Sequence, residues 1–399
     1  MVRARASAAE RFGLKAAPAI AAFALAGAFF TAAHAASVVP APGVSAHKIV
    51  VASLLDLSGP LAGEGAAIKN GLLMAFDEIN KKGGINGRKI ELRVEDTGYD
   101  PLKAKAAAEK LVDEGVFAVM CSNGTPPVSA SMPVFLNSGV LHLFPFTAAD
   151  KIYVPSQPLE FTLDQPVKAQ IREGLDILLA GRGDLKVGVL ARDDTFGNEA
   201  ISGAEAALAA RGAHIGETAL FPPGTREFTA ALKKLRRAGT ELVVIGAVAQ
   251  DAIDAIKQAH FSGWYPVFLC PQACYQPEVA TLGGHTLSGL YAVAATPIPY
   301  PGDTDLRDWV RNYEAHFATA ASPQALRAYL DARLFAEALA RSGTHPTQRY
   351  FARVLENMPP WRDPVYGGLP IDFTAKDHLG LHQSYLAQIR SGRWQLINR

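Results

Sequence analysis

The sequence contains few cysteines and carries almost no net charge. Only 3 of the 399 residues are cysteines, and no CxxC pair or cysteine–histidine cluster with zinc spacing occurs. A disulfide scaffold and a zinc-built fold are therefore excluded, and we expect no metal site. The 39 basic and 38 acidic residues give a net charge of +1. Because no large field of one sign would attract a polyanion, we expect no nucleic-acid partner.

Familiar catalytic motifs are also missing. The sequence contains neither the G-x-S-x-G elbow of hydrolases nor the H-E-x-x-H pair of zinc proteases. A glycine-rich turn at Gly63 and Gly65 begins like a dinucleotide loop, but Ile68 stands where the third glycine belongs. His142 lies inside an apolar run, where a buried hydrogen-bonded residue is a simpler interpretation than a catalytic base. We therefore expect no catalytic residues, no cofactor and no enzyme activity.

The start of the chain has the pattern of an export signal. Residues 1–15 carry four basic residues and one acidic residue, residues 16–33 are apolar and uncharged, and the letters A-H-A follow at 33–35. This pattern predicts a secretory signal peptide over residues 1–35. An uncleaved membrane anchor is the alternative, which the weak hydrophobicity of the alanine-rich segment disfavours. Cleavage leaves a short linker, residues 36–47, and a mature chain with a net charge of −2.

Export would place the cysteines in an oxidising compartment. The odd number of cysteines leaves at least one thiol free. Cys270 and Cys274 would pair only if the segment between them loops back, and the sequence leaves this open.

From residue 48 onward, apolar runs alternate with segments of helical period. Continuous runs of this kind are typical of strands that are covered on both faces. They occupy residues 49–55, 116–121, 140–144, 187–191, 242–245 and 267–270. The alternation occurs twice, over residues 48–163 and 165–290, and a helical stretch follows at 303–358. It predicts an α/β fold with two lobes, and a ligand beyond the carboxyl ends of parallel strands.

Two polar turns follow strands of the first lobe. The first turn contains Ser122, Asn123, Gly124 and Thr125, and the second contains Phe146 and Thr147. The hydroxyls and free backbone N–H groups of the first turn would suit a carboxylate or another anion. Helix capping by Ser122 or Thr125 is the alternative, and the two roles are compatible.

In the second lobe, Asp193 and Asp194 follow a strand. Adjacent carboxylates invite a general acid/base role, and a secreted hydrolase is the corresponding alternative function. Neighbours on an extended chain point apart, however, so we expect at least one of the two to cap a helix.

Several longer motifs carry a family resemblance. They read S-G-P at 58–60, A-F-D-E-I-N at 75–80, G-G-I-N-G-R-K at 83–89, D-P at 100–101, D-T-F-G at 194–197 and L-G-G at 282–284. The glycine-rich motif of seven residues is the most specific of them. Over nearly all of the mature chain, the sequence resembles the leucine/isoleucine/valine-binding type of periplasmic solute receptor that feeds ABC importers.

This resemblance implies a type I periplasmic-binding-protein fold. Two Rossmann-like lobes with parallel-sheet cores would be joined by three hinge crossovers and would close around a small ligand. Lobe 1 would comprise residues 48–164 plus 293–377, and lobe 2 would comprise residues 165–292 plus 378–399. The implied partners are a small-molecule ligand and the membrane permease of an ABC importer. The implied location is the periplasm, and we expect a monomer.

The resemblance also implies a ligand site. In amino-acid-binding members, the turns that match Ser122 and Thr147 hold the ligand carboxylate, and an aromatic residue at the position of Phe196 covers the ligand. A second-lobe carboxylate holds the α-ammonium, but Gln272 stands at that position here. Because an ammonium buried without a counter-charge is costly, an ordinary amino acid is disfavoured as the ligand.

Two further positions depart from the family pattern. Glu64 replaces a tyrosine of the first glycine-rich loop, and it either supplies a compensating carboxylate or lies as a solvated residue at the helix start. Cys121 matches a cysteine that is disulfide-bonded in some relatives, but Tyr99 stands at the partner position, so we expect no bridge there.

These features predict a periplasmic receptor for a small organic ligand that is amino-acid-like and bears a carboxylate or an amide. Ser122, Thr125 and Thr147 would hydrogen-bond its polar end. The residues that pack against its apolar part would be Phe146, Phe196 and Tyr275. A ligand sensor that acts through a signalling partner is the alternative.

Overall fold

The computed structural model describes residues 40–149, 152, 156–180, 185–300, 306–363 and 367–397. The predicted signal peptide and its cleavage site lie outside these residues. Residues 40–399 group together as one unit. No helix in the described part of the chain is long and apolar enough to cross a membrane.

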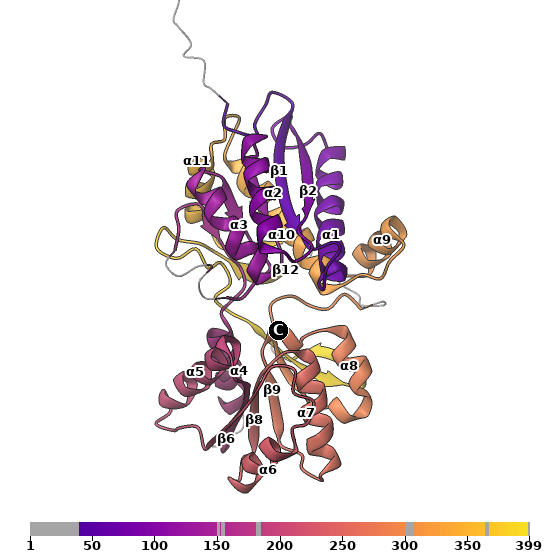
Figure 1. The fold of residues 1–399 in the computed structure, drawn as a ribbon. Coiled ribbons are helices and arrows are strands. Elements are labelled where there is room, and N and C mark those ends of the chain that lie inside the picture. Colours follow the sequence, from indigo (N-terminus) through magenta and orange to yellow (C-terminus); the bar gives the residue numbers. More distant parts are fainter. Residues whose placement is uncertain are drawn as a thin grey trace, which may run out of the picture. The chain divides into compact units, whose positions relative to one another are not determined.

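Five parallel strands form the first sheet, in the order β2-β1-β3-β4-β5. Figure 1 shows β1 and β2 of this sheet side by side. These strands are β1 Lys48–Leu55, β2 Lys89–Asp96, β3 Ala118–Met120, β4 Leu141–Leu143 and β5 Glu160–Phe161. The helices that pack on the sheet are α1 Ala62–Lys81, α2 Pro101–Asp113, α3 Thr125–Asn137, α10 Pro323–Arg341 and α11 Gln348–Asn357. The first lobe therefore combines an N-terminal sheet with helices from late in the chain.

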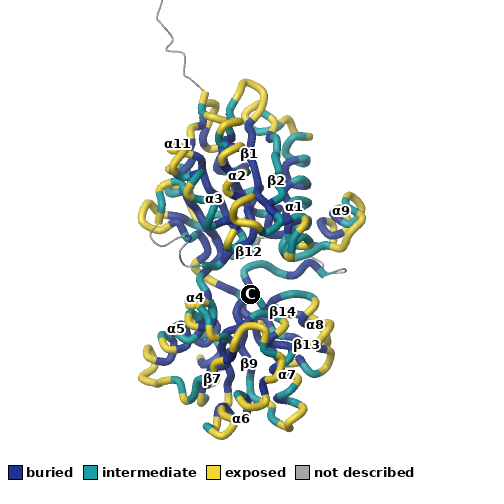
Figure 2. The backbone as a smooth tube through the Cα atoms, in the orientation of Figure 1, coloured by how far each residue is buried: buried dark blue, intermediate teal, exposed yellow. Residues whose placement is uncertain are grey.

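Successive residues of β1 belong to opposite faces of this sheet. Ile49 and Val51 pack in a cluster with α1, α10 and α11, whereas Val50 and Ala52 pack in a cluster with α2 and α3. Both faces are therefore covered, which is why the strand is apolar at nearly every position. The central strands are accordingly buried, as Figure 2 shows.

The second sheet has seven strands in the order β14-β13-β10-β9-β8-β6-β7. These strands are β6 Val187–Arg192, β7 Glu217–Phe221, β8 Leu242–Gly246, β9 Val267–Cys270, β10 Tyr291–Ala294, β13 Tyr385–Arg390 and β14 Arg393–Leu396. The strands from β7 to β10 run parallel, and β13 and β14 add an antiparallel edge.

Helices cover both faces of the second sheet as well. Helices α4 and α5 pack in one apolar cluster, and α6, α7 and α8 pack in another. Their bounds are α4 Val167–Ala180, α5 Thr195–Ala209, α6 Thr229–Arg237, α7 Ala249–Phe261 and α8 Pro277–Gly283. Each sheet thus has its own core, as the two-lobe α/β prediction requires.

The chain passes between the two lobes three times. It passes first between β5 and α4, and it returns after β10 to α9, Arg307–Phe317, whose Trp309 is buried in the first core. The ribbon of β11, Trp361–Asp363, and β12, Gly367–Ile371, also packs on the first core, before the last pass leads to β13. These are the three crossovers that the sequence resemblance implied.

The structure shifts two of the expected lobe boundaries. A boundary after residue 292 would cut β10, although all four residues of this strand pair with β13 in the second sheet. A boundary after residue 377 would exclude Leu381, which is buried in the first core. We propose boundaries after Ala294 and after Leu381 instead.

Apolar runs in the sequence did not reveal the interior strands β10 and β13, nor the edge strands β2 and β7. Most residues of β2 are only half-buried, and β7 exposes Leu220. An edge strand carries polar residues between apolar ones, so it lacks the continuous apolar run that identified the central strands.

Candidate functional site

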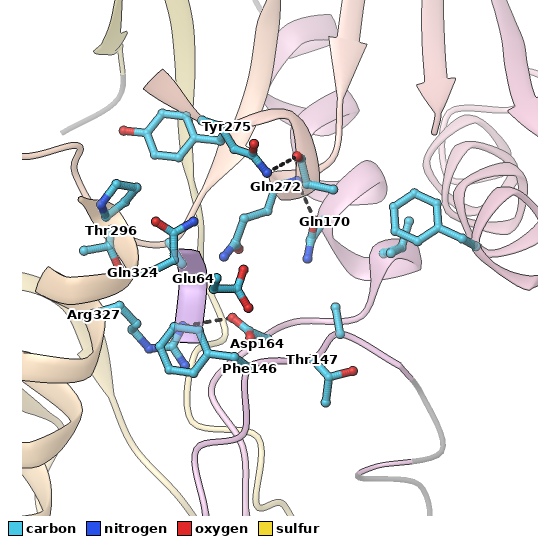
Figure 3. Close-up of a pocket in the computed structure, with 17 residues that line it drawn as sticks. Glu64, Phe146, Thr147, Asp164, Gln170, Gln272, Tyr275, Thr296, Gln324 and Arg327 are labelled. Carbon is cyan, nitrogen blue, oxygen red and sulfur yellow. Dashed lines mark hydrogen bonds and ion pairs between the residues drawn. The ribbon is translucent and has the colours of Figure 1, made fainter. Parts of the chain in front are cut away.

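A cavity of about 270 Å³ lies between residues of the two lobes (Figure 3). Its first-lobe lining comprises Glu64, Phe146, Thr147, Ala148, Pro323, Gln324 and Arg327. Its second-lobe lining comprises Val167, Gln170, Phe196, Gln272, Ala273, Tyr275 and Gln276, and the crossovers add Asp164, Ala295 and Thr296. Several of these residues directly follow β4, β9 and β10, where parallel sheets present ligand sites.

Six of the ten expected site residues line this cavity. They are Glu64, Phe146, Thr147, Phe196, Gln272 and Tyr275. The remaining four, Ser122, Asn123, Gly124 and Thr125, lie in the turn before α3 and do not line it.

This turn supports the cavity wall through hydrogen bonds. The buried Ser122 accepts a hydrogen bond at Oγ from the backbone N–H of Leu54, at 3.3 Å. Asn123 Oδ1 accepts one from the N–H of Asp56 at 2.9 Å, and Asn123 Nδ2 donates to Glu64 Oε1 at 3.1 Å. Asn123 therefore positions Glu64 instead of facing the cavity itself.

The start of α3 offers fewer donors than we expected. Gly124 occupies the cap position without a side-chain cap, so the alternative of capping by Ser122 or Thr125 is wrong. Pro126 and Pro127 follow in the first turn, and proline has no backbone N–H to offer an anion.

Thr125 reaches the cavity indirectly. Its Oγ1 shares a hydrogen bond of 2.7 Å with Oγ1 of Thr147, which does line the cavity. The hydroxyl pair is thus held in place between the two polar turns of the first lobe.

Glu64 is a first-lobe carboxylate that can still accept a hydrogen bond from a ligand. Only Oε1 accepts a hydrogen bond from a described residue, namely Asn123. Burial raises the pKa of Glu64, the negative charges of Asp164 and Asp56 raise it further, and the Asn123 amide opposes this shift. The second carboxylate oxygen is left to accept a hydrogen bond from a ligand.

A buried charge network lies beside Glu64. Arg327 Nη1 donates to Asp164 Oδ1 at 2.9 Å, and Arg327 Nε donates to Asp331 Oδ1, also at 2.9 Å. Cys121 Sγ donates to Asp331 Oδ2 at 3.7 Å. Phe146 lies over the guanidinium, with 5.2 Å between its ring centroid and Arg327 Cζ.

The network contains two acidic side chains, Asp164 and Asp331, and one basic side chain, Arg327. Burial raises the pKa of Asp331 to about 7, although Arg327 opposes this shift. Burial lowers the pKa of Arg327, but the two carboxylates prevail and raise it overall, so the guanidinium stays charged. Arg327 is shared between Asp164 and Asp331, which leaves it little attraction for a further anion.

The second-lobe wall is neutral. The backbone N–H of Gln272 donates to Oε1 of the buried Gln170 at 2.8 Å, and Gln170 Nε2 donates to the carbonyl oxygen of Gln165 at 2.8 Å. The side-chain amide of Gln272 makes no hydrogen bond with any described residue. Phe196 and Tyr275 supply the aromatic surface of this wall.

Apart from Glu64, the sequence missed the charged part of the site and also the neutral Gln170. Asp164, Gln170 and Arg327 were not expected to line the cavity. A signal was available, because Arg327 and Asp331 lie one helical turn apart within a stretch of α10 that is otherwise apolar on its buried face. Opposite charges on a buried helix face indicate a buried network.

Asp193 and Asp194 do not form a catalytic pair. Asp194 caps α5 by accepting a hydrogen bond from the N–H of Gly197 at 3.0 Å, and it also pairs with Arg192 at 2.9 Å. Asp193 is exposed, and neither residue lines the cavity. The prediction of a helix cap is confirmed.

The three cysteines are free and buried. Cys121 has no bridge, as expected, and Cys270 and Cys274 are unpaired at the two ends of the segment that carries Gln272. Within the described ranges, no group of three or more histidine, cysteine, aspartate or glutamate residues could hold a metal ion.

The chain is similar to known solute-binding proteins. A family model described as periplasmic binding protein matches residues 48–393. The leucine-, isoleucine-, valine-, threonine-, and alanine-binding protein of Pseudomonas aeruginosa is 24% identical over 303 residues, which are 75% of this chain and 80% of that protein.

Solved structures share the fold. A substrate-binding periplasmic protein from Ralstonia solanacearum has a TM-score of 0.71 at 25% identity, covering 87% of this chain and 99% of that one. A fatty acid ABC transporter substrate-binding protein from Thermomonospora curvata has a TM-score of 0.74 at 20% identity, covering 90% of this chain and 94% of that one. At that identity, the second likeness shows the fold alone.

Proposed function

Because the chain belongs to the periplasmic binding protein family, we propose that it captures a small organic ligand in this cavity and delivers it to the membrane permease of an ABC importer. The supporting observation is that one cavity takes its lining from both lobes. Family membership also makes the chain a solute-binding protein, not an enzyme.

The three crossovers support a hinge mechanism. A ligand that contacts both walls favours the conformation in which the lobes lie close together. Domain closure of this type presents a changed surface to a partner, here the permease. Export through a cleaved signal peptide, a periplasmic location and a monomeric state complete the proposal.

The size of the cavity bounds the ligand. A volume of about 270 Å³ lies just below the usual range of pockets for drug-sized ligands. A metabolite with a short apolar group fits this volume. The Pseudomonas relative is named for leucine, isoleucine, valine, threonine and alanine. The ligand proposed for this chain has a similar size. Its polar end is held differently, because the neutral Gln272 faces the cavity.

A thermal-shift screen of the purified protein tests this proposal. The panel contains amino acids, amines, amides and carboxylates, and a ligand at about 1,000 times its Kd adds about 4 kcal/mol to stability. Phe196→Ala removes an aromatic wall of the cavity, so we expect it to weaken binding of the hit about tenfold or more.

Phe261→Ala is the matched control, because Phe261 is 97% exposed and does not line the cavity. Equal losses in the two variants, or a panel without any stabilising compound, would contradict the proposed function.

A further inference from the structure

The cavity carries more negative than positive charge. Glu64 and Asp164 line it, and Asp331 lies directly behind Arg327. Arg327 is the one base among the described lining residues. The lining thus sets the two carboxylates of Glu64 and Asp164 against a single guanidinium that is itself paired with Asp164 and Asp331, so the field inside the cavity favours a cation.

Arg327 is a poor site for an anionic ligand group. Its Nε and Nη1 atoms are bound by Asp331 and Asp164, and Phe146 covers the guanidinium. Its Nη2 atom is buried and makes no hydrogen bond with the described residues. The two carboxylates nevertheless already offset the charge that would draw a carboxylate to this atom.

The other donors that could face an anion are neutral. Pro126 and Pro127 remove two backbone N–H groups from the start of α3, and Ser122 does not line the cavity. The second-lobe wall contributes amides and aromatic rings and no base. A free ligand carboxylate would therefore find only neutral donors, such as the hydroxyls of Thr147 and Thr296 and the side-chain amide of Gln272.

Glu64, in contrast, is prepared to hold a cation. Asn123 fixes one of its oxygens, and the other makes no hydrogen bond within the described residues. Asn123 is itself buried and tied to the backbone of the first sheet, so the carboxylate is positioned before any ligand arrives. A charge-assisted hydrogen bond from a protonated nitrogen would use this free oxygen.

We propose that the ligand carries a protonated nitrogen, as an amine or an amino-acid amide does, that Glu64 binds this nitrogen, and that no free carboxylate is required. This inference rests on the proposed function and names its ligand class. The apolar part of the ligand then packs against Phe196 and Tyr275 of the second lobe.

Three ligands with the same carbon skeleton test this inference. Leucinamide carries the protonated nitrogen without a carboxylate, leucine carries both groups, and 4-methylpentanamide carries neither. Calorimetric titration at about pH 6.5, where an α-amino group is protonated, should rank leucinamide first. We expect 4-methylpentanamide to bind at least tenfold more weakly than leucinamide.

Glu64→Gln then isolates the carboxylate. The substitution keeps an oxygen that accepts from Asn123, and it should weaken leucinamide about 30-fold while leaving 4-methylpentanamide unchanged. Glu278→Gln is the matched control, because Glu278 is exposed on α8 and outside the cavity lining. A urea unfolding curve of each variant without ligand confirms that both remain folded.

The outcomes separate the two proposals. If leucine binds more tightly than leucinamide, the ligand needs its carboxylate, and if Glu64→Gln leaves leucinamide unaffected, Glu64 does not bind the nitrogen. Either result overturns this inference while the receptor function stands. If none of the three ligands binds, the proposed ligand class is wrong, and the wider panel described above decides separately on the receptor function.

Discussion

The two walls of the cavity differ in their chemistry. The first-lobe wall contains Glu64, which accepts a hydrogen bond from Asn123, and Arg327, which donates to Asp164 of the adjoining crossover. The second-lobe wall contains Gln272 and Phe196, which carry no charge.

This difference indicates that the two lobes contribute in different ways to ligand binding. Charged groups gain most when they are positioned before the ligand binds, because reorientation then costs nothing at the moment of binding. Aromatic and amide groups contribute mainly by covering apolar surface and require no counter-charge. The first lobe would therefore select the polar end of the ligand, and the second lobe would complete its burial.

The charged wall should also be the more fragile of the two. Arg327→Met leaves Asp164 and Asp331 buried without their cation, so we expect a loss of about 3–5 kcal/mol in the free energy of unfolding. Urea unfolding measures this loss. Arg311→Met is the control, because Arg311 is exposed and pairs with Asp308 only on the surface, at 3.1 Å. A similar loss in both variants would show that the buried network contributes no more to the free energy of unfolding than a surface ion pair does.

A carboxylate in the second-lobe wall would remove the difference in charge between the two walls. Gln272→Glu introduces a carboxylate opposite Glu64, and we expect about tenfold tighter binding of leucinamide, or about 1.4 kcal/mol. Gln395→Glu adds the same charge at an exposed site on β14, away from the cavity. Calorimetric titration of both variants decides this, and unchanged affinity in Gln272→Glu would indicate that the second wall does not face the ligand nitrogen.

A smaller loss of stability is expected from a substitution at Asp96, which binds the loop that leads to α1 and Glu64. The Ser58 hydroxyl, together with the N–H groups of Leu57 and Gly98, lowers the pKa of Asp96 to about 2. A lowered pKa stabilises the fold above the ordinary value near 3.8, and this stabilisation is lost as the pH falls toward 2. Because the group is partly exposed, we expect Asp96→Asn to cost about 1 kcal/mol at pH 7.

This cost should shrink when unfolding is repeated at about pH 2.5, since the wild-type carboxylate is then partly protonated. A cost that is the same at both pH values would show that the ionised carboxylate is not what holds the loop.

Sequence pattern predicted most of the central strands because of where they lie, although it missed the interior strands β10 and β13. Residues 49–55 and 242–245 are apolar at nearly every position, since β1 and β8 are covered on both faces. The turn that follows such a strand offered Phe146 and Thr147 as expected site residues, because carboxyl ends of parallel strands meet at one edge, whereas Gln272 was expected from the family resemblance. Edge strands β2 and β7 were missed, since partial exposure removes the continuous run.

The α/β fold class and the two lobes follow from sequence pattern, and the family resemblance adds Glu64, Gln272 and Phe196 as expected site residues. The charged network around Arg327, in contrast, depends on the tertiary structure. Arg327 and Asp164 are 163 residues apart in sequence, and Cys121 and Asp331 are 210 residues apart, yet all four belong to one network. Periodicity reports which side of an element is buried. It carries no information on which distant charge will lie opposite, because the crossovers and the packing of α10 against the first sheet set that pairing.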